Sequence, residues 1–491
     1  MSTLKKIVIL GGGTAGWMAA NLMAKKWKNK PIAIYLIESP CIGIVGVGEG
    51  STPTLKAFFN QMNIAESEWM PACNATYKLN IRFNGWSPSS PLNSYSHPFK
   101  SQVDVHSERS FFVNCLTRRM GLNVTTDPEL FFLNGVLAQK KLKPEAAINF
   151  PFNTEYGYHF DSALLGTFLK EKAVALGVTH YQGKVTSVEQ HIDGSIKHLV
   201  TDANNVFEGD FFIDCSGFEA VLMRQKLKVK FTSFSDNLFN DSAVVIPTNT
   251  PYDNSIETIS TALSAGWAWE IPLANRQGNG YVYSSQFIDS DKAERELRDH
   301  LGIIDKDVNA KHLKMNIGQL ESHWSKNCLA LGLSQGFIEP LEATALHLVQ
   351  TSIDSFITLF EQGDFTNKYQ TTYNKIVNER FESVRDYIVA HYKLNSRHDS
   401  DYWKENRENL ILSDALLHIL DCWYKGKELT QEVVMSQTGS QFSLSSWHCL
   451  LAGNNVFPSL AVKQPGVGDL YREYQLEKFY ANCSLNFASI I

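Results

Sequence analysis

The chain has 491 residues, of which 44% are hydrophobic and 20% are charged, and its formal net charge is -6. This length exceeds what one simple core usually supports, so the sequence predicts one large two-part domain or two closely associated domains. The negative net charge provides no broad attraction to nucleic acid or to an anionic membrane, and it disfavours partners of either kind.

Cysteine use and hydropathy predict the compartment. The eight cysteines include no CxxC pair, a pattern that favours reduced thiols over a disulfide framework and predicts no metal site. The apolar run before the first glycines is too short for a signal-peptide core, and no later stretch reaches transmembrane length. The sequence therefore predicts a cytoplasmic protein.

The first residues predict a βαβ unit around a glycine-rich turn. The run KKIVIL (5–10) predicts a buried strand, GGGTAG (11–16) a tight turn, and the apolar spacing over 17–28 a helix. A second strand is predicted over 31–38, ending at Glu38. Two strands joined by a helix in this way are typical of a dinucleotide-binding fold.

Within this unit, Gly11, Gly13 and Gly16 match the pattern GxGxxG. The glycines allow the backbone of the turn, with Thr14 and Ala15, to approach a pyrophosphate at the positive end of a helix. Glu38 is placed to accept hydrogen bonds from the ribose hydroxyls of an adenosine. The alternative is a glycine-rich turn that binds no ligand.

Later segments predict further elements. They are an amphipathic helix over 161–178, a hairpin that turns at Asp193-Gly194, two apolar strands that run into glycine turns (210–217 and 327–336), and a mostly helical tail from about 346. NAD and FAD share the glycine pattern. The late turn ALGLSQGF (330–337) and GVGEGSTPT (46–54) favour FAD, because its longer body needs several distant segments.

Seven stretches, in chain order, resemble the flavin-dependent tryptophan halogenases: GGGTAGWMAA, GVGEGSTPTL, TYKLNIRFNGW, SHPF, GWAWEIPL, GNGYVYSS and GFIEPLEATALH. WAWEIP fits WxWxIP, which in this family distinguishes halogenases from flavin monooxygenases. The resemblance implies an α/β fold with a Rossmann-like FAD-binding module of the flavin monooxygenase type (1–60 and 155–350). It also implies a mainly helical substrate-binding subdomain (61–154 and 351–491).

The resemblance also implies a reaction. Reduced FAD and dioxygen would oxidise chloride or bromide to hypohalous acid, which passes through a tunnel to a small aromatic substrate. A separate NAD(P)H-dependent flavin reductase would supply the reduced FAD, because the sequence contains no second dinucleotide motif.

Two matched residues would carry the chemistry. Lys78 matches the family's essential lysine, which holds hypohalous acid by hydrogen bonding or forms a haloamine, and both mechanisms remain open. Taken alone, Lys78 would be a solvated surface lysine. Glu342 matches the active-site glutamate, which orients the electrophile or takes the proton from the arene. The alternative is a carboxylate that only stabilises the first turn of a predicted helix.

The resemblance assigns further positions to the cofactor, the halide and a shield between flavin and substrate. Cofactor positions are Glu49, Gly50, Val185, Leu333 and Leu346; halide positions are Thr344 and Ala345; shielding positions are Trp267, Trp269, Ile271 and Pro272. Tryptophan-using members have glycine where this chain has Ala345. The added methyl group and the restricted φ suggest the hypothesis that bromide is used better than chloride.

His97 and Phe99 match positions that pack on the indole ring of the substrate. The tyrosines and glutamate that grip the amino acid end of tryptophan have no counterpart in the C-terminal stretch SQTGSQFSLSSWHCLLAG (436–453). We therefore expect a bare indole or a larger indole-containing substrate. Trp447 either lines the pocket or anchors a helix.

Two rival functions remain. One is a flavin monooxygenase that hydroxylates an aromatic ring, and the other is an FAD-binding scaffold that has lost catalysis. The sequence leaves the oligomeric state open, a homodimer included.

Overall fold

The computed structural model describes residues 5–43, 48–249, 255–438 and 441–490. The backbone contacts divide the chain into two compact units, each made of three segments. Unit 1 comprises residues 1–75, 160–234 and 316–381, and unit 2 comprises 76–159, 235–315 and 382–491. These bounds differ from those predicted for the two domains, and the assignment of segments to cofactor or substrate stays a prediction.

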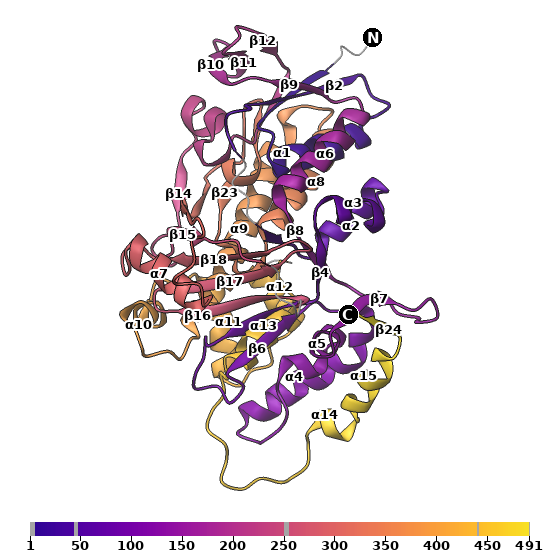
Figure 1. Cartoon of the computed structure of the whole chain (residues 1–491), viewed down its shortest axis with the longest axis vertical. Coiled ribbons are helices and arrows are strands. Elements are labelled where there is room, and N and C mark those ends of the chain that lie inside the picture. Colours follow the sequence, from indigo (N-terminus) through magenta and orange to yellow (C-terminus); the bar gives the residue numbers. More distant parts are fainter. Residues whose placement is uncertain (1–4, 44–47, 250–254, 439–440, 491) are drawn as a thin grey trace. The chain divides into compact units, whose positions relative to one another are not determined.

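Unit 1 is built on a six-stranded sheet in the order β21-β22-β13-β1-β2-β9 (Figure 1). All neighbours pair in parallel except β21 and β22, which are antiparallel. The strands are β1 (Lys5–Leu10), β2 (Ile32–Glu38), β9 (Thr179–Gln182), β13 (Phe211–Asp214), β21 (Trp324–Ser325) and β22 (Cys328–Ala330). The helix α1 (Thr14–Lys26) joins β1 to β2, so the predicted βαβ unit is confirmed.

The remaining elements of unit 1 include the predicted helix after 161 and the predicted hairpin. Its helices are α1, α2 (Thr54–Met62), α3 (Glu66–Ala72), α6 (Ser162–Ala175) and α8 (Ala345–Gln362). Its smaller sheets contain β10 (Val185–Gln190), β11 (Ile196–Thr201) and β12 (Val206–Glu208), and β14 (Phe231–Ser233), β20 (Gly318–Leu320) and β23 (Gly336–Phe337). The apolar faces of β1, β13 and β10–β11 share one core.

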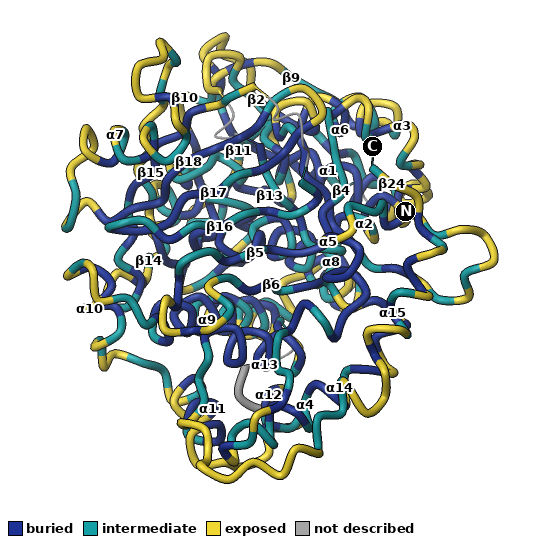
Figure 2. The backbone as a smooth tube through the Cα atoms, turned by 60° about the horizontal axis from the view of Figure 1, so that its bottom comes forward, coloured by how far each residue is buried: buried dark blue, intermediate teal, exposed yellow. Residues whose placement is uncertain are grey.

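Unit 2 is built on a seven-stranded sheet in the order β19-β15-β18-β17-β16-β5-β6. Its strands are β5 (Asn80–Asn84), β6 (Ser94–Pro98), β15 (Ser242–Val245), β16 (Glu257–Leu263), β17 (Gly266–Pro272), β18 (Gln277–Tyr283) and β19 (Lys311–Lys314). The strands β16, β17 and β18 form an antiparallel meander, and β5 joins β16 in parallel. Figure 2 shows the central strands of this sheet as largely buried.

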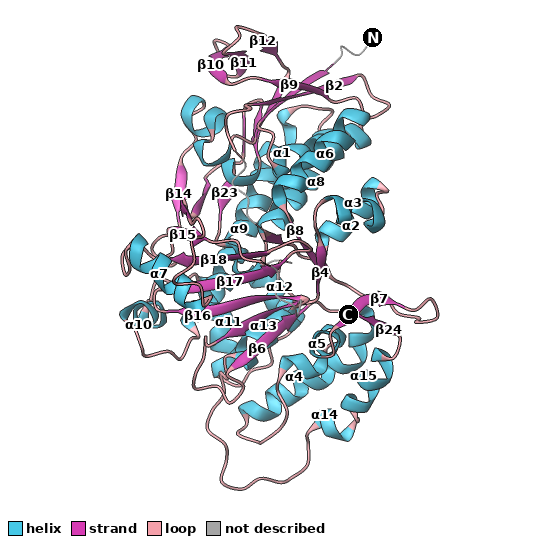
Figure 3. Cartoon of the chain, viewed as in Figure 1, coloured by secondary structure: helices cyan, strands magenta, loops and turns pink. Residues whose placement is uncertain are grey.

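Helices make up most of the rest of unit 2, and Figure 3 shows α4, α5, α14 and α15 as one group. The helices are α4 (Val105–Arg119), α5 (Leu133–Gln139), α7 (Ser290–His300), α10 (Asp401–Glu408), α11 (Asp414–Tyr424), α12 (Gln431–Thr438), α13 (Leu444–Gly453), α14 (Leu470–Glu473) and α15 (Leu476–Ser484). The division between the units falls within α9 (Gln370–Lys393). Two further pairs of short strands are β4 (Thr76–Lys78) with β8 (Gly157–Phe160) and β7 (Leu142–Ala146) with β24 (Phe487–Ser489).

The helical tail predicted from about 346 is therefore confirmed, with β24 as a short exception. Among the helices in the described part of the chain, none is long and apolar enough to cross a membrane.

Candidate active site

The glycine-rich turn lies between β1 and α1 in unit 1, and each glycine of the pattern has distinct surroundings. A Cβ on Gly11, whose φ is +116°, would lie 2.1 Å from the carbonyl oxygen of Cys215, directly after β13. A Cβ on Gly16 would lie 2.0 Å from the carbonyl oxygen of Gly11, whereas one on Gly13 would meet nothing within 4 Å. Gly11 and Gly16 therefore allow strand and helix to pack closely, and Gly13 leaves the helix N-terminus open.

The N-terminus of α1 suits an anionic group. Gly13 is its N-cap residue, no side chain caps it, and its first turn contains no acidic residue. The first N–H groups of an α-helix have no intrahelical acceptor and carry partial positive charge. A pyrophosphate, as in FAD, fits these donors and the open space beside Gly13.

A distant turn, Gly332–Ser334, contacts the same helix. A Cβ on Gly332, whose φ is +65°, would lie 2.8 Å from the Cβ of Ala15. The buried carboxylate of Asp214 anchors this turn, because it accepts a hydrogen bond of 3.1 Å from the Ser334 hydroxyl. The turn therefore packs directly against the start of α1.

The other predicted cofactor residues lie on elements of unit 1. Leu333 is half-buried in the distant turn, Leu346 is buried at the start of α8, and Val185 packs on the core beneath β10. Burial raises the pKa of Glu49 in β3 (Glu49–Gly50) to about 7; a hydrogen bond with Ser162 opposes the shift, and the charge of Asp161 adds to it. In the predicted stretch 46–54, residues 46 and 47 lie outside the described residues.

Glu342 lies before α8 and not in the first turn of that helix, so that part of the prediction is wrong. It ends a 3₁₀ turn (Pro340–Glu342) and is 3% exposed. Ala343 follows in the left-handed conformation (φ 55°, ψ 35°), which breaks the helical path, and α8 begins only after Thr344.

The start of α8 presents the predicted halide positions. Thr344 is the N-cap residue, and its side chain makes no capping hydrogen bond. Ala345 is the first helical residue and is not among the described residues with positive φ. Alanine adopts this backbone conformation without strain, and the first N–H groups have no intrahelical acceptors.

Trp267 and Trp269 lie on the same face of β17, in the middle of the sheet of unit 2. Their ring centres are 6.2 Å apart, and both side chains are buried. Trp269 lies opposite Gly280 of β18, and a Cβ on Gly280 would lie 2.2 Å from the Trp269 ring. The glycine makes room for the indole. Ile271 and Pro272 complete the buried end of the strand.

Lys78, at the end of β4 in unit 2, is fully buried. Its Nζ atom lies 5.5 Å from the centre of the Phe99 ring. Burial and the charge of Lys78 lower the pKa of His159 well below its ordinary value, so this imidazole is neutral at pH 7. Removing an ammonium group from water is costly, and Lys78 is therefore not the solvated surface lysine that its residue type alone predicts.

An aromatic cluster surrounds the N-terminal half of α13. His97 Nε2 lies 2.9 Å from the Ser446 hydroxyl, and Tyr387 donates a hydrogen bond of 2.8 Å to the Ser446 carbonyl oxygen. Tyr387 stacks on Phe442 at 3.7 Å and meets Trp447 edge-on at 4.9 Å. Trp447 is fully buried, as an anchor of α13 would be. A role in binding substrate stays a proposal.

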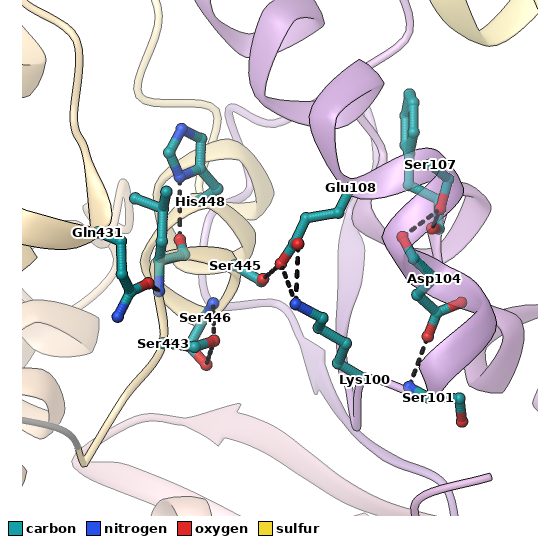
Figure 4. Close-up of polar contacts among 12 residues, drawn as sticks. Lys100, Ser101, Asp104, Ser107, Glu108, Gln431, Ser443, Ser445, Ser446 and His448 are labelled. Carbon is teal, nitrogen blue, oxygen red and sulfur yellow. Dashed lines mark hydrogen bonds and ion pairs between the residues drawn. The ribbon is translucent and has the colours of Figure 1, made fainter. Parts of the chain in front are cut away.

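Serines at the start of α13 hydrogen-bond within the helix and with a carboxylate from α4 (Figure 4). Ser443 caps α13 by accepting from the Ser446 N–H at 3.2 Å. Ser445 donates to Glu108, whose carboxylate also pairs with Lys100 at 2.7 Å. The carboxylate of Glu108 is therefore already paired.

The prediction did not include Lys170, His180 or Asp214. Lys170 and His180 contact Glu38 in unit 1, from α6 and β9. Their spacing in the sequence carries no signal, because tertiary packing alone brings them to Glu38. Asp214, by contrast, ends the predicted strand 210–217, and an acid at that point could have been identified.

These features are those of a flavoprotein-like α/β protein, with a candidate dinucleotide site in unit 1. Unit 2 contains a buried lysine beside Phe99 and a separate aromatic cluster around α13. Residues 6–465 match the profile of the tryptophan halogenase family. The chain is 37% identical over 448 residues to tryptophan 6-halogenase SttH of Streptomyces toxytricini, covering 85% of this chain and 83% of that protein. The chain belongs to the tryptophan halogenase family, and it is a flavin-dependent halogenase.

Solved structures agree with this assignment. The crystal structure of SttH superposes with a TM-score of 0.87 at 33% identity, covering 99% of this chain and 98% of that chain. BrvH, a flavin-dependent halogenase from Brevundimonas sp. BAL3, superposes with a TM-score of 0.83 at 30% identity, covering 98% and 96%. The Rossmann-like fold expected from the sequence is thereby confirmed.

Proposed function

We propose that the protein uses reduced FAD, dioxygen and chloride or bromide to halogenate an electron-rich aromatic ring, with an indole-like compound as substrate. The observation that carries this proposal is the pair Trp267 and Trp269, buried on one face of the central strand β17. Two buried indoles at that place would exclude a large molecule from the oxidant, as a halogenase requires.

The cofactor would be held by the glycine turn of unit 1, by Glu38 and by the turn at Leu333. When bound, reduced FAD would supply, with dioxygen, the oxidising equivalent that converts a halide into an electrophile. The chain's own residues bind the pyrophosphate at the N-terminus of α1 and the adenosine ribose at Glu38. A separate NAD(P)H-dependent reductase supplies the reduced flavin.

The halide would be bound at the start of α8 by the N–H groups of Thr344 and Ala345. Helix N-termini attract anions through unpaired N–H groups and the helix dipole. Glu342 comes directly before this point in the chain, and its buried carboxylate orients the electrophile or takes the proton released by the ring.

Lys78 would hold the electrophile for attack by the ring. A buried ammonium or amine has few competing water molecules, so it binds hypohalous acid by hydrogen bonding or reacts with it to a haloamine. Phe99, beside the Nζ atom, and His97 then pack on the substrate ring.

The residues around α13 bear on whether the substrate is tryptophan or a bare indole. SttH carries the name tryptophan 6-halogenase, but the residues around α13 offer serine hydroxyls and a carboxylate already paired with Lys100. A free amino acid needs partners for both its charges, and a bare indole needs none. Indole-like compounds without the amino acid group are therefore the better substrates.

The test compares indole with tryptophan, each with FAD, NADH, a flavin reductase and bromide or chloride, with products identified by mass spectrometry. The proposal expects halogenated indole at a higher rate than halogenated tryptophan. A Glu342→Gln variant should lose roughly a hundredfold in rate, as general acid–base groups do. Oxygenated products that form without halide would instead support the monooxygenase, and rapid halogenation of tryptophan alone would overturn the substrate assignment.

The eight cysteines are all free thiols, which fits the proposed location in the reducing cytoplasm.

A further inference from the structure

The carboxylate of Glu38 accepts a hydrogen bond from Lys170 and lies against the ring of His180, two side chains from separate elements of unit 1. Its Oε1 atom lies 3.0 Å from Lys170 Nζ and 2.8 Å from His180 Nε2. Lys170 belongs to α6 and His180 to β9. Both partners contact the same oxygen atom, so they fix the orientation of the carboxylate.

The second oxygen atom of Glu38 faces the glycine-rich turn. A Cβ on Gly12 would lie only 1.8 Å from Oε2. Among the described residues, no donor makes a hydrogen bond to Oε2, whose lone pairs are therefore available. An acceptor oriented toward a dinucleotide turn is what the hydroxyls of an adenosine ribose require.

Both partners are themselves held in place. His180 meets Trp17 edge-on with ring centres 5.4 Å apart, and Trp17 lies in the first turns of α1. Asn21 of α1 donates a hydrogen bond of 2.7 Å to the carbonyl oxygen of Leu169, the residue before Lys170. The helix that carries the glycine turn thus fixes both groups that orient Glu38.

Charge gives Lys170 a second effect. A carboxylate close to a pyrophosphate meets two negative charges, and a cation paired with the carboxylate reduces that repulsion. We infer that Lys170 and His180 are positioning residues that turn Glu38 toward the adenosine ribose, so that tight binding of FAD, but not of FMN, depends on them. This inference rests on the proposed FAD cofactor.

The contrasting explanation is that Lys170 and Glu38 form an ordinary, partly exposed ion pair, which contributes little to stability or binding. Lys172, two residues along the same helix, provides a matched control. Its side chain is 32% exposed against 31% for Lys170, and it pairs with Glu68. A role as a mere surface ion pair predicts the same behaviour for both lysines.

The experiment measures dissociation constants of oxidised FAD and FMN by flavin fluorescence for the full chain and its variants, each checked for folding by circular dichroism. Lys170→Met should weaken FAD binding about tenfold, the loss of one charged hydrogen bond, with FMN binding unchanged. Lys170→Arg should retain FAD binding, and Lys172→Met should change neither constant. In a Glu38→Gln background, Lys170→Met should have no further effect.

Several results would overturn the inference. Equal losses for FAD and FMN, equal effects of Lys170→Met and Lys172→Met, or additive effects of Lys170→Met and Glu38→Gln would each do so. Wild-type protein that binds FMN as tightly as FAD would overturn both this inference and the proposed cofactor, whereas tight FAD binding unaffected by Lys170→Met would overturn this inference alone.

Discussion

At the scale of single residues, the fully buried Lys78 beside Phe99 is the side chain whose placement most needs a reason. Replacing it by methionine keeps the length and the apolar stem but removes the ammonium group. We expect Lys78→Met to lower the yield of halogenated indole by roughly a hundredfold or more, as loss of a catalytic group does, while reduced flavin is still consumed. Product mass spectrometry run beside an oxygen-uptake assay measures both quantities.

A yield that falls only in proportion to oxygen uptake would contradict this role, since the defect would then lie before the electrophile is formed.

Gly280 tests the packing of the tryptophan pair. Its missing side chain leaves room for Trp269, and a methyl group there would lie 2.2 Å from the indole. Gly280→Ala should lower the free energy of unfolding by about 1–3 kcal/mol, as overpacking does, and should lower halogenation as well. Urea unfolding measures the first effect. Gly43→Ala, where a Cβ meets nothing within 4 Å, is the control, and equal stability changes in the two variants would contradict the packing argument.

At the scale of elements, we expect the N-terminus of α8, as the proposed halide site, to set the halide preference. Ala345 adds an apolar methyl group beside the N–H groups of the first turn, and the weakly hydrated bromide loses less than chloride there. We expect more brominated than chlorinated indole at equal halide concentrations. Ala345→Gly should lower that ratio about fourfold, the effect of one methyl group. Exclusively chlorinated product from the wild-type protein would refute this preference.

The junction of α4, α5 and α15 contains a buried acid that makes stability depend on pH. Asp104 accepts hydrogen bonds from the N–H groups of Ser101 (2.6 Å) and Leu133 (2.7 Å) and from the hydroxyl of Tyr480 (2.8 Å). Burial nevertheless raises the pKa of Asp104 to about 7, although these bonds and the charge of Lys100 oppose the shift. The folded protein therefore retains a proton that the unfolded chain loses near pH 4.

Because the folded-state pKa lies above the unfolded one, the stabilising contribution is complete below about pH 4 and is lost as pH rises through about 7. Between these limits the wild-type protein should lose roughly 2–4 kcal/mol relative to Asp104→Asn, whose amide does not titrate. Chemical unfolding at several pH values measures the difference. The exposed Asp305→Asn variant should follow the wild type, and a pH-independent difference between wild type and Asp104→Asn would contradict the account.

Local pattern explains which elements could be predicted. The run KKIVIL, the glycines and Glu38 lie within one βαβ unit, and the structure confirms β1, α1 and β2 with ends within a few residues. The prediction that Glu342 lies in the first turn of α8 was wrong. The periodicity of the residues around it does not reveal that Ala343 adopts a left-handed conformation.

At the scale of the whole molecule, the sequence proposed residues for the site but did not predict which side chains lie beside them. Lys78, Phe99 and the tryptophan pair were found through motifs, and the structure places Lys78 beside Phe99 and Trp267 beside Trp269. Lys170 and His180 were missed, because α6 and β9 reach Glu38 only through long-range packing. The bounds of the compact units were not predicted either, since each unit combines three separate stretches of the chain.

The central proposal is that the oxidising equivalent from the flavin is transferred to a halide and then to an aromatic ring. The most direct test supplies indole, FAD, NADH and a flavin reductase with bromide, with chloride and with no halide, and identifies the products by mass spectrometry. The account predicts halogenated indole only when halide is present and none from Lys78→Met. Hydroxylated indole that forms equally well without halide would contradict it.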